Sequence, residues 1–245
     1  MNPQHVIRPI PLILGASRLS DHTYRVDLGR KVVTCTYIWY IEGPKKRILV
    51  DTGTDAESFR QYGYPGRKDV QTPEQGLAKI GLKPEDIDIV IPTHLHFDHF
   101  FFASKYTQAQ FIVQKAELDY QRNPLPFETR KPMREDALNG IDVKLIDGDY
   151  EVEEGVRLLF TPGHTGGGQS VAIDTAKGTA IISGLCSIPE NFYPPDHFKD
   201  LVEVIPSMIH VDLRQSYDSL LRIKESADII IPLHDIQFSF IDVIP

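Results

Sequence analysis

The stretch Thr93–His99 constrains the fold of this chain more than any other feature, because it places four potential metal ligands within six residues. It directly follows an apolar run that is typical of a buried strand. Imidazoles and a carboxylate bind zinc, iron or manganese only when the backbone aims them at one point. A strand end can do this, since the two-residue spacing of His94 and His96 places both side chains on one side of an extended chain. Asp98 and His99 follow as the chain turns, and we expect them to face the same pocket.

Two further histidines follow apolar runs downstream, in Pro162-Gly163-His164 and in Leu233-His234-Asp235. A polar loop that happens to be rich in histidine is the alternative interpretation of the first stretch alone. Three separate strand ends that each deliver histidine are not expected by chance. The pattern therefore predicts a metal site at the carboxyl ends of several strands, where open α/β sheets place their sites.

Length and charge limit the class of protein. With 245 residues the chain can bury a sizeable core, and we expect one domain over residues 1–245. The formal net charge of −8 argues against a nucleic-acid or anionic-membrane surface. Two distant cysteines form no disulfide framework. The chain shows neither a signal-peptide pattern nor an apolar run long enough to span a membrane, so a cytoplasmic protein is expected.

The first half of the chain is predicted to be a β-meander followed by a helix and the strand before the histidines. Thr72–Gln75 has the pattern of a capping box with proline at the first helical position, and Gly81 ends that helix. The segment Asp51–Asp55 either makes a simple turn or lines the site. Strands are expected at residues 10–14, 32–41, 47–50 and 87–91.

The second half repeats this alternation of strands and helices. Residues 123–135 contain three prolines and no periodicity, so they form either a loop over the site or a plain surface excursion. Two halves that both supply ligands suggest sheets packed face to face with helices outside. Strands are expected at residues 110–113, 143–146, 156–160, 170–173, 180–182 and 229–231, and helices at 115–121 and 212–224.

These motifs resemble the metallo-β-lactamase superfamily, whose His-x-His-x-Asp-His hallmark is matched by residues 94–99. The resemblance covers nearly the whole chain, because an early Asp-Thr-Gly turn (51–53), a third-ligand loop (161–164) and a last-ligand segment (233–235) match as well. It implies an α/β fold built as a four-layer αβ/βα sandwich, with the metals at one edge between the two sheets. Phrases such as Glu190-Asn191-Phe192 resemble the N-acyl-homoserine lactonases within this superfamily.

The resemblance also implies a ligand set for two divalent transition-metal ions, with zinc expected and iron or manganese as alternatives. Asp51 and Asp235 are candidates to accept the outer N–H groups of ligand histidines. His5 and His22 are expected on the surface. The implied ligands are His94, His96 and His164 for one metal, and Asp98, His99 and His234 for the second.

The sequence departs from the lactonase pattern at two positions. The bridging aspartate of that family falls at Gly184, and its catalytic tyrosine falls at Ser187. Cys186 is a candidate ligand in place of the bridge, although it can equally pack as a small apolar side chain. The leaving alkoxide would then be stabilised by the second metal, by a water, or by a hydroxyl of Ser187 or Tyr193.

Together these features predict a metal-dependent hydrolase that opens a lactone or a small carboxylic ester with a hydroxide held by the metals. Asp98 would both ligate and orient that hydroxide. A thioester hydrolase and a metal-binding sensor without turnover are the alternatives.

The expected partner is a small molecule, with no nucleic acid or membrane, and the chain would be a monomer or a homodimer. In the aromatic run of Phe97 and residues 100–102, one or two rings are expected to line an apolar pocket.

Overall fold

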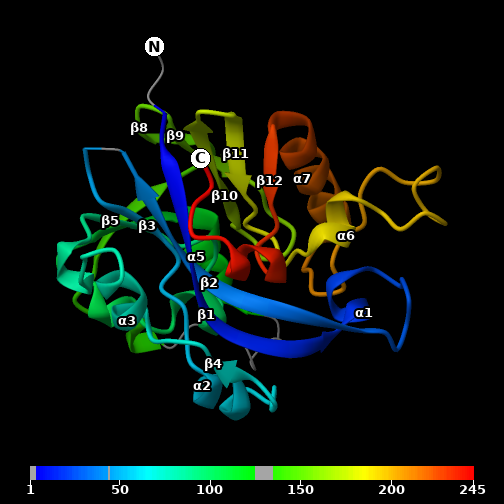
Figure 1. The fold of residues 1–245 in the computed structure, drawn as a ribbon, viewed down its shortest axis with the longest axis horizontal. Helices are drawn as coiled ribbons and strands as arrows, with labels where there is room; N and C mark the ends of the chain where they lie inside the picture. Colours follow the sequence, from blue (N-terminus) through cyan, green and yellow to red (C-terminus); the bar gives the residue numbers. More distant parts are fainter. Residues whose placement is uncertain (1–3, 44, 125–134) are drawn as a thin grey trace.

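The computed structural model describes residues 4–43, 45–124 and 135–245, which form two β-sheets flanked by helices (Figure 1). The larger sheet has the strand order β4-β1-β2-β3-β5-β6-β7, and the smaller has the order β12-β11-β10-β9-β8. The strands of the larger sheet are β1 (Val6–Arg18), β2 (Lys31–Glu42), β3 (Ile48–Val50), β4 (Lys68–Asp69), β5 (Ile89–Ile91), β6 (Gln110–Gln114) and β7 (Asp142–Ile146). Those of the smaller sheet are β8 (Tyr150–Glu153), β9 (Val156–Phe160), β10 (Gln169–Thr175), β11 (Gly178–Ile182) and β12 (Ile229–Ile231).

The predicted β-meander opens the larger sheet. β1, β2 and β3 pair antiparallel in sequence order, and β1 is longer than the expected strand at residues 10–14 because its pairing with β2 runs from Val6 to Arg18. The strands β3, β5, β6 and β7 then run parallel to one another. Their carboxyl ends therefore meet at one edge of the sheet, which is the edge at which β5 delivers the histidine stretch.

Helices cover the outer face of each sheet. The helices α2 (Ala56–Gln61), α3 (Pro73–Ala78) and α4 (Phe97–Phe100) cover the larger sheet, and α6 (Pro189–Phe192) and α7 (Leu213–Ser226) cover the smaller one (Figure 1). Along β2, Tyr37 and Trp39 point into a core shared with the smaller sheet, whereas Ile38 points to the opposite face. That opposite face packs against α2, α3 and α4, and the outer face of the smaller sheet packs against α6 and α7. This confirms the predicted four-layer αβ/βα sandwich. The helices are α1 (Leu19–His22), α2 (Ala56–Gln61), α3 (Pro73–Ala78), α4 (Phe97–Phe100), α5 (Lys115–Arg122), α6 (Pro189–Phe192) and α7 (Leu213–Ser226).

Local sequence signals locate the longer elements better than the short ones. The capping box forms as predicted, with the Thr72 hydroxyl accepting from Gln75 N and the Gln75 side chain accepting from Thr72 N. The elements α1, α2, α4, α6, β4 and β8 are not predicted, because each is too short to show a periodic pattern. Of the loop expected at 123–135, residues 125–134 lie outside the described residues. No helix in the described ranges is long and apolar enough to cross a bilayer. Short 3₁₀ helices cover Pro84–Asp86, Ala103–Lys105, Glu135–Leu138 and Ile236–Phe240.

Candidate metal centre

The histidine stretch leaves β5 and folds back as a short helix. His94 lies in the connection, His96 is the N-cap residue of α4, and Asp98 and His99 lie within that helix. Potential ligand atoms of His94, Asp98 and His99 lie within 4.8 Å of one another. The turn after the strand therefore brings this part of the predicted ligand set to one point.

The two downstream histidines arrive at the same edge from the smaller sheet. His164 follows β9, and its Nε2 lies 3.2 Å from His94 Nε2; together with His96 these residues form a second group of potential ligands. His234 follows β12, and its ring centroid lies 5.2 Å from that of His99. The structure thus brings five of the six implied ligands into two groups that share His94, and it places the His234 ring beside that of His99.

Hydrogen bonds to the outer ring nitrogens orient four of the histidines. Nδ1 of His99 donates to Asp51, that of His164 to the Ile209 carbonyl, and that of His234 to the Cys35 carbonyl. The Thr93 hydroxyl donates to Asp51 and can therefore accept from Nδ1 of His94. A carbonyl oxygen can only accept, so the hydrogen of the neutral ring resides on Nδ1 and the lone pair on Nε2. Such fixed tautomers are typical of metal-ligating histidines.

The inner nitrogens fit a bound cation. Nε2 of His99 is buried and has no hydrogen-bond partner in the described part of the chain. It lies 3.4 Å from an oxygen of Asp98. The Nε2 atoms of His94 and His164 face each other, and two lone pairs in that position need a positive charge between them. Imidazole nitrogens with one carboxylate form a donor set that suits zinc, iron or manganese.

The electrostatics of the cluster favour a divalent ion. Burial disfavours the charged form of His99, but the carboxylates of Asp98 and Asp51 outweigh this effect and raise its pKa to about 10. Burial, and then the charge on His99, lower the pKa of His234 to about 3. Burial alone would raise the pKa of Asp98, yet the neighbouring histidines hold it well below its usual range. The two carboxylates therefore stabilise positive charge at His99, and a metal ion bound at Nε2 would supply that charge in place of a proton.

Asp51 positions His99 and the backbone at Thr93 through hydrogen bonds to its carboxylate. It follows β3 with a left-handed φ of 62°, and its buried carboxylate accepts from Thr93 N and Thr93 Oγ1 as well as from His99. The segment therefore makes the turn and also orients a ligand, as expected for Asp51. The expectation for Asp235 is wrong, because its carboxylate accepts from Gln237 N and the Cys35 carbonyl orients His234 instead.

Glu117 on α5 is a positioning residue that the sequence analysis missed. Its buried carboxylate accepts from Leu95 N in the first ligand loop and from Gly167 N in the loop of His164. Burial raises its pKa, and the hydrogen bonds that it accepts oppose that rise. A Cβ at Gly167 would lie 2.0 Å from Glu117 N, so this glycine permits the close approach. One glutamate in a short helix carries no sequence pattern that would reveal this role.

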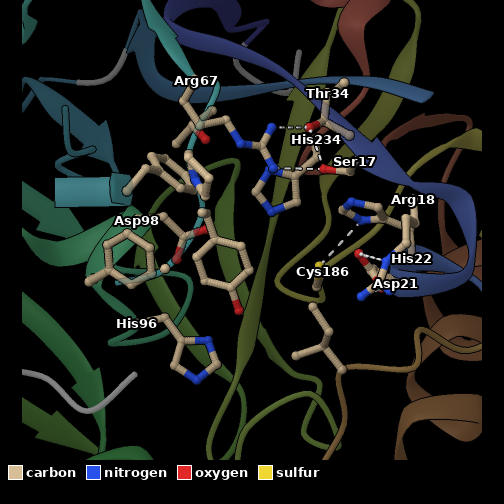
Figure 2. A pocket seen from close by; sticks show the side chains of 18 of the residues that line it. Ser17, Arg18, Asp21, His22, Thr34, Arg67, His96, Asp98, Cys186 and His234 are labelled. Carbon is tan, nitrogen blue, oxygen red and sulfur yellow. Dashed lines mark hydrogen bonds and ion pairs between the residues drawn. The ribbon is translucent and has the colours of Figure 1, made fainter. Parts of the chain in front are cut away.

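A cavity of about 330 Å³ opens above the predicted ligands (Figure 2). Its wall includes the rings of Phe59, Tyr64 and Phe97, so one ring of the predicted aromatic run lines the pocket. Phe100, by contrast, is part of the core. This volume and mixed lining are typical of small-molecule sites.

Cys186 and His22 form a pair in the cavity wall. The Cys186 sulfur lies 3.5 Å from His22 Nδ1, and the His22 ring centroid lies 5.9 Å from that of His234 (Figure 2). The expectation that His22 and His5 are on the surface is wrong, because both are buried. Among the described residues, neither group of clustered ligand atoms includes the Cys186 thiol.

The structure places Ser187 and Tyr193 away from the cavity lining. Ser187 is fully buried, its hydroxyl accepts from Leu233 N, and its carbonyl accepts from His234 N. It therefore supports the backbone of the last ligand. Tyr193 is 60% exposed and its ring faces the ammonium group of Lys224. Neither hydroxyl is placed to contact a leaving group in the cavity.

The backbone around Gly184, the position expected for the bridging aspartate, leaves no room for a side chain. A Cβ at this position would lie 2.0 Å from the carbonyl oxygen of Gln169. Gln169 is itself held by its side-chain bonds to the carbonyls of Pro92 and Ile112. A side chain at Gly184 would therefore collide with a fixed strand and would not enter the ligand cluster.

Comparison with known proteins agrees with this geometry. Residues 29–234 match the family described as the Metallo-beta-lactamase superfamily. An N-acyl homoserine lactonase of Bacillus cereus is 32% identical over 204 residues, which are 79% of this chain and 75% of that protein. A crystal structure of a quorum-quenching N-acyl homoserine lactone lactonase superposes with a TM-score of 0.75 at 27% identity, covering 97% of this chain and 94% of the other. A similar hydrolase structure, with N-hexanoyl-L-homoserine bound at its catalytic metal centre, gives a TM-score of 0.75 at 26% identity and covers 98% and 96% of the two chains.

Proposed function

This chain belongs to the metallo-beta-lactamase superfamily, and we propose that it is a metal-dependent hydrolase that opens a lactone or a small carboxylic ester. The observation that carries the proposal is the convergence of imidazoles and one ionised carboxylate, from both sheets, beneath a cavity of small-molecule size. The names of the similar lactonases support the same class of reaction.

Two divalent ions would be held by the six residues named above, and zinc is proposed from the donor set. Metal ions in such sites lower the pKa of a water molecule and polarise a carbonyl oxygen. The chain itself contributes the orientation of the ligands through Asp51 and Glu117. Asp98, which stays ionised, is proposed to orient the attacking water.

The rings of Phe59, Tyr64 and Phe97 form an aromatic wall of the cavity. This aromatic wall is proposed to pack against the apolar part of the substrate and to exclude bulk water from it. Phe97 is stacked on Tyr62 with ring centroids 4.1 Å apart, and Phe59 packs edge-on against Phe97 at 5.1 Å. These contacts hold the wall in one arrangement. A substrate ring or short acyl chain would therefore meet a preformed surface.

The stability of the departing anion is proposed to decide which substrates this site hydrolyses fastest. Ser187 stands at the position expected for the lactonase tyrosine, and neither Ser187 nor Tyr193 lines the cavity, whose wall includes Tyr64 instead. A positioned general acid contributes about 10²- to 10⁴-fold to a rate. Aryl esters and thioesters expel stable anions and need this help least. Thioester hydrolysis is therefore the second candidate function.

We expect the zinc-loaded protein to hydrolyse aryl esters and thioesters with kcat/KM at least about 10²-fold above that for N-acyl homoserine lactones. The measurement is a colorimetric comparison of aryl esters, thioesters, homoserine lactones, β-lactams and phosphodiesters on one metal-loaded preparation. Opening of long-chain homoserine lactones at about 10⁶ M⁻¹s⁻¹ or more would show that the missing groups are unnecessary. No turnover on any substrate, with metals bound, would favour a metal-binding sensor.

Cys186 is proposed as the additional ligand on the side of the second metal. Its support is its place in the cavity wall beside His22, whose ring centroid lies 5.9 Å from that of His234. Cys186→Ala is then expected to lower metal content from about two ions per chain toward one, because a coordinating thiolate contributes directly to affinity. The matched control is Cys35→Ala, because the Cys35 thiol is also buried but donates to the Thr36 carbonyl. Equal metal content and rates in both variants would leave Cys186 as a packing partner of His22.

A further inference from the structure

Arg67 enters the cavity from the segment between α2 and β4. Its Nη1 donates to Thr34 Oγ1 at 2.8 Å and its Nη2 donates to Ser17 Oγ at 2.7 Å (Figure 2). The guanidinium carbon lies 5.0 Å from the centroid of the Phe59 ring, which belongs to the aromatic wall. The charged end of the side chain is therefore held in one position in the cavity lining.

Asp98 and Asp21 act on the charge of Arg67 from a distance, but neither forms an ion pair with it in the described part of the chain. Within residues 4–43, 45–124 and 135–245, no carboxylate lies within ion-pairing distance of it, and its two hydrogen-bond partners are neutral hydroxyls. Arg18 lines the same cavity and differs in this respect, since it forms an ion pair with Asp21 at 3.2 Å. A half-buried cation without an ion pair is costly to the fold, because burial removes its hydration.

The β1–β2 hairpin has a glycine, Gly15, where the Arg67 side chain passes over β1. A Cβ at Gly15 would lie 2.2 Å from Arg67 Cδ, so only glycine leaves room for the arginine to cross the strand. Gly15 lies opposite Thr34 in the β1–β2 ladder, and Thr34 is one of the residues that hold the guanidinium. The arginine, its two acceptors and the glycine beneath it thus form one preorganised unit.

We propose that Arg67 is a specificity-determining residue that binds a carboxylate carried by the substrate in addition to the bond that is hydrolysed. This inference rests on the proposed hydrolase function and names its substrate class: half-esters of dicarboxylic acids and lactones that bear a carboxylate. The planar guanidinium retains N–H groups beyond those used by Ser17 and Thr34, and its fork matches a carboxylate. The aromatic wall beside it would pack against the carbon chain between the two groups.

The test compares two esters with the same leaving group, 4-nitrophenyl hydrogen glutarate and 4-nitrophenyl valerate, on the metal-loaded protein. Wild type is expected to prefer the anionic ester, and Arg67→Gln to lower the ratio of the two kcat/KM values by about 10- to 100-fold, as for loss of a charge-assisted hydrogen bond. Hydrolysis forms a new carboxylate from both esters, so any effect of Arg67 on that product group is the same for both and cancels in the ratio. Arg18→Gln, with the same charge change in the same cavity, is expected to alter the ratio less than about threefold because Arg18 is already paired.

Gly15→Ala gives a second variant that leaves the arginine in the sequence. Its methyl group should displace Arg67 and lower the ratio as Arg67→Gln does, so the result does not depend on the folding of one variant. A wild type that shows no preference for the anionic ester would overturn the inference. Equal effects of Arg67→Gln and Arg18→Gln would also overturn it, since they would indicate general attraction by the cavity.

Binding separates this inference from the proposed function. Calorimetric titration with N-phenyl glutaramate and with the neutral N-phenyl valeramide requires no turnover. Tighter binding of the anion, lost in Arg67→Gln, would support the role of Arg67 even if no ester were hydrolysed. Equal binding of the two amides, together with measurable ester hydrolysis, would retain the hydrolase and reject the carboxylate site.

Discussion

His96→Ala is expected to lower kcat/KM for ester hydrolysis by about 10³- to 10⁴-fold, because a disrupted metal site forfeits several kcal/mol of transition-state stabilisation. His96 belongs to the group of clustered ligand atoms with His94 and His164. Its side chain makes no capping hydrogen bond to α4, so the substitution should leave that helix intact. Elemental analysis, kcat/KM and the melting temperature measured on one preparation would show lost metal and activity with a preserved fold.

His197→Ala is the matched control for this variant. His197 is an exposed histidine whose ring lies 3.9 Å from Asp27 and does not line the cavity. Its replacement is expected to leave metal content and kcat/KM near those of wild type. If wild type itself bound less than about half a metal ion per chain after growth with zinc, iron and manganese, the ligand assignment would fail before any variant was compared.

Gly184→Asp combined with Ser187→Tyr, which inserts the two residues typical of lactonases, is expected to destabilise the protein and not to create lactonase activity. The added Cβ would lie 2.0 Å from the Gln169 carbonyl. Ser187→Tyr would also remove the hydroxyl that accepts from Leu233 N. Overpacking of this kind costs about 3 kcal/mol, which corresponds to a decrease in melting temperature of about 6–12 °C for a chain of this size.

Gly184→Ala isolates the collision from the effect of a new charge. It should show most of the loss in melting temperature, since the clash involves Cβ and not the carboxylate. A double variant that melted within about 2 °C of wild type, bound two metals and opened homoserine lactones faster would contradict this reasoning. It would mean that the strand of Gln169 moves to admit a bridging aspartate.

Local patterns account for the parts of the site that the sequence predicts. The histidine stretch after an apolar run, the capping box at Thr72 and the alternation along β2 each involve neighbours in the chain, and the structure shows all of them. The residues alone suggested two sheets packed face to face with helices outside, and resemblance to a family added the assignment of the ligands to two metals. The expectation for Ser187 came from counting along the chain and that for Tyr193 from its nearby hydroxyl, and neither described where the side chain points.

The sequence by itself thus determined the types of the candidate metal ligands, the strands that deliver them and the absence of an aspartate at residue 184. Only the tertiary structure decided how those residues are supported and what else faces the cavity. Arg67 donates to Ser17, which lies 50 residues earlier in the chain. Cys186 contacts His22 at a separation of 164 residues, and Asp51 accepts from Thr93 at a separation of 42. Such contacts depend on how the two sheets and their loops close on one another. A single sequence carries no periodic or local signal for them, because the partners come together only when the chain has folded.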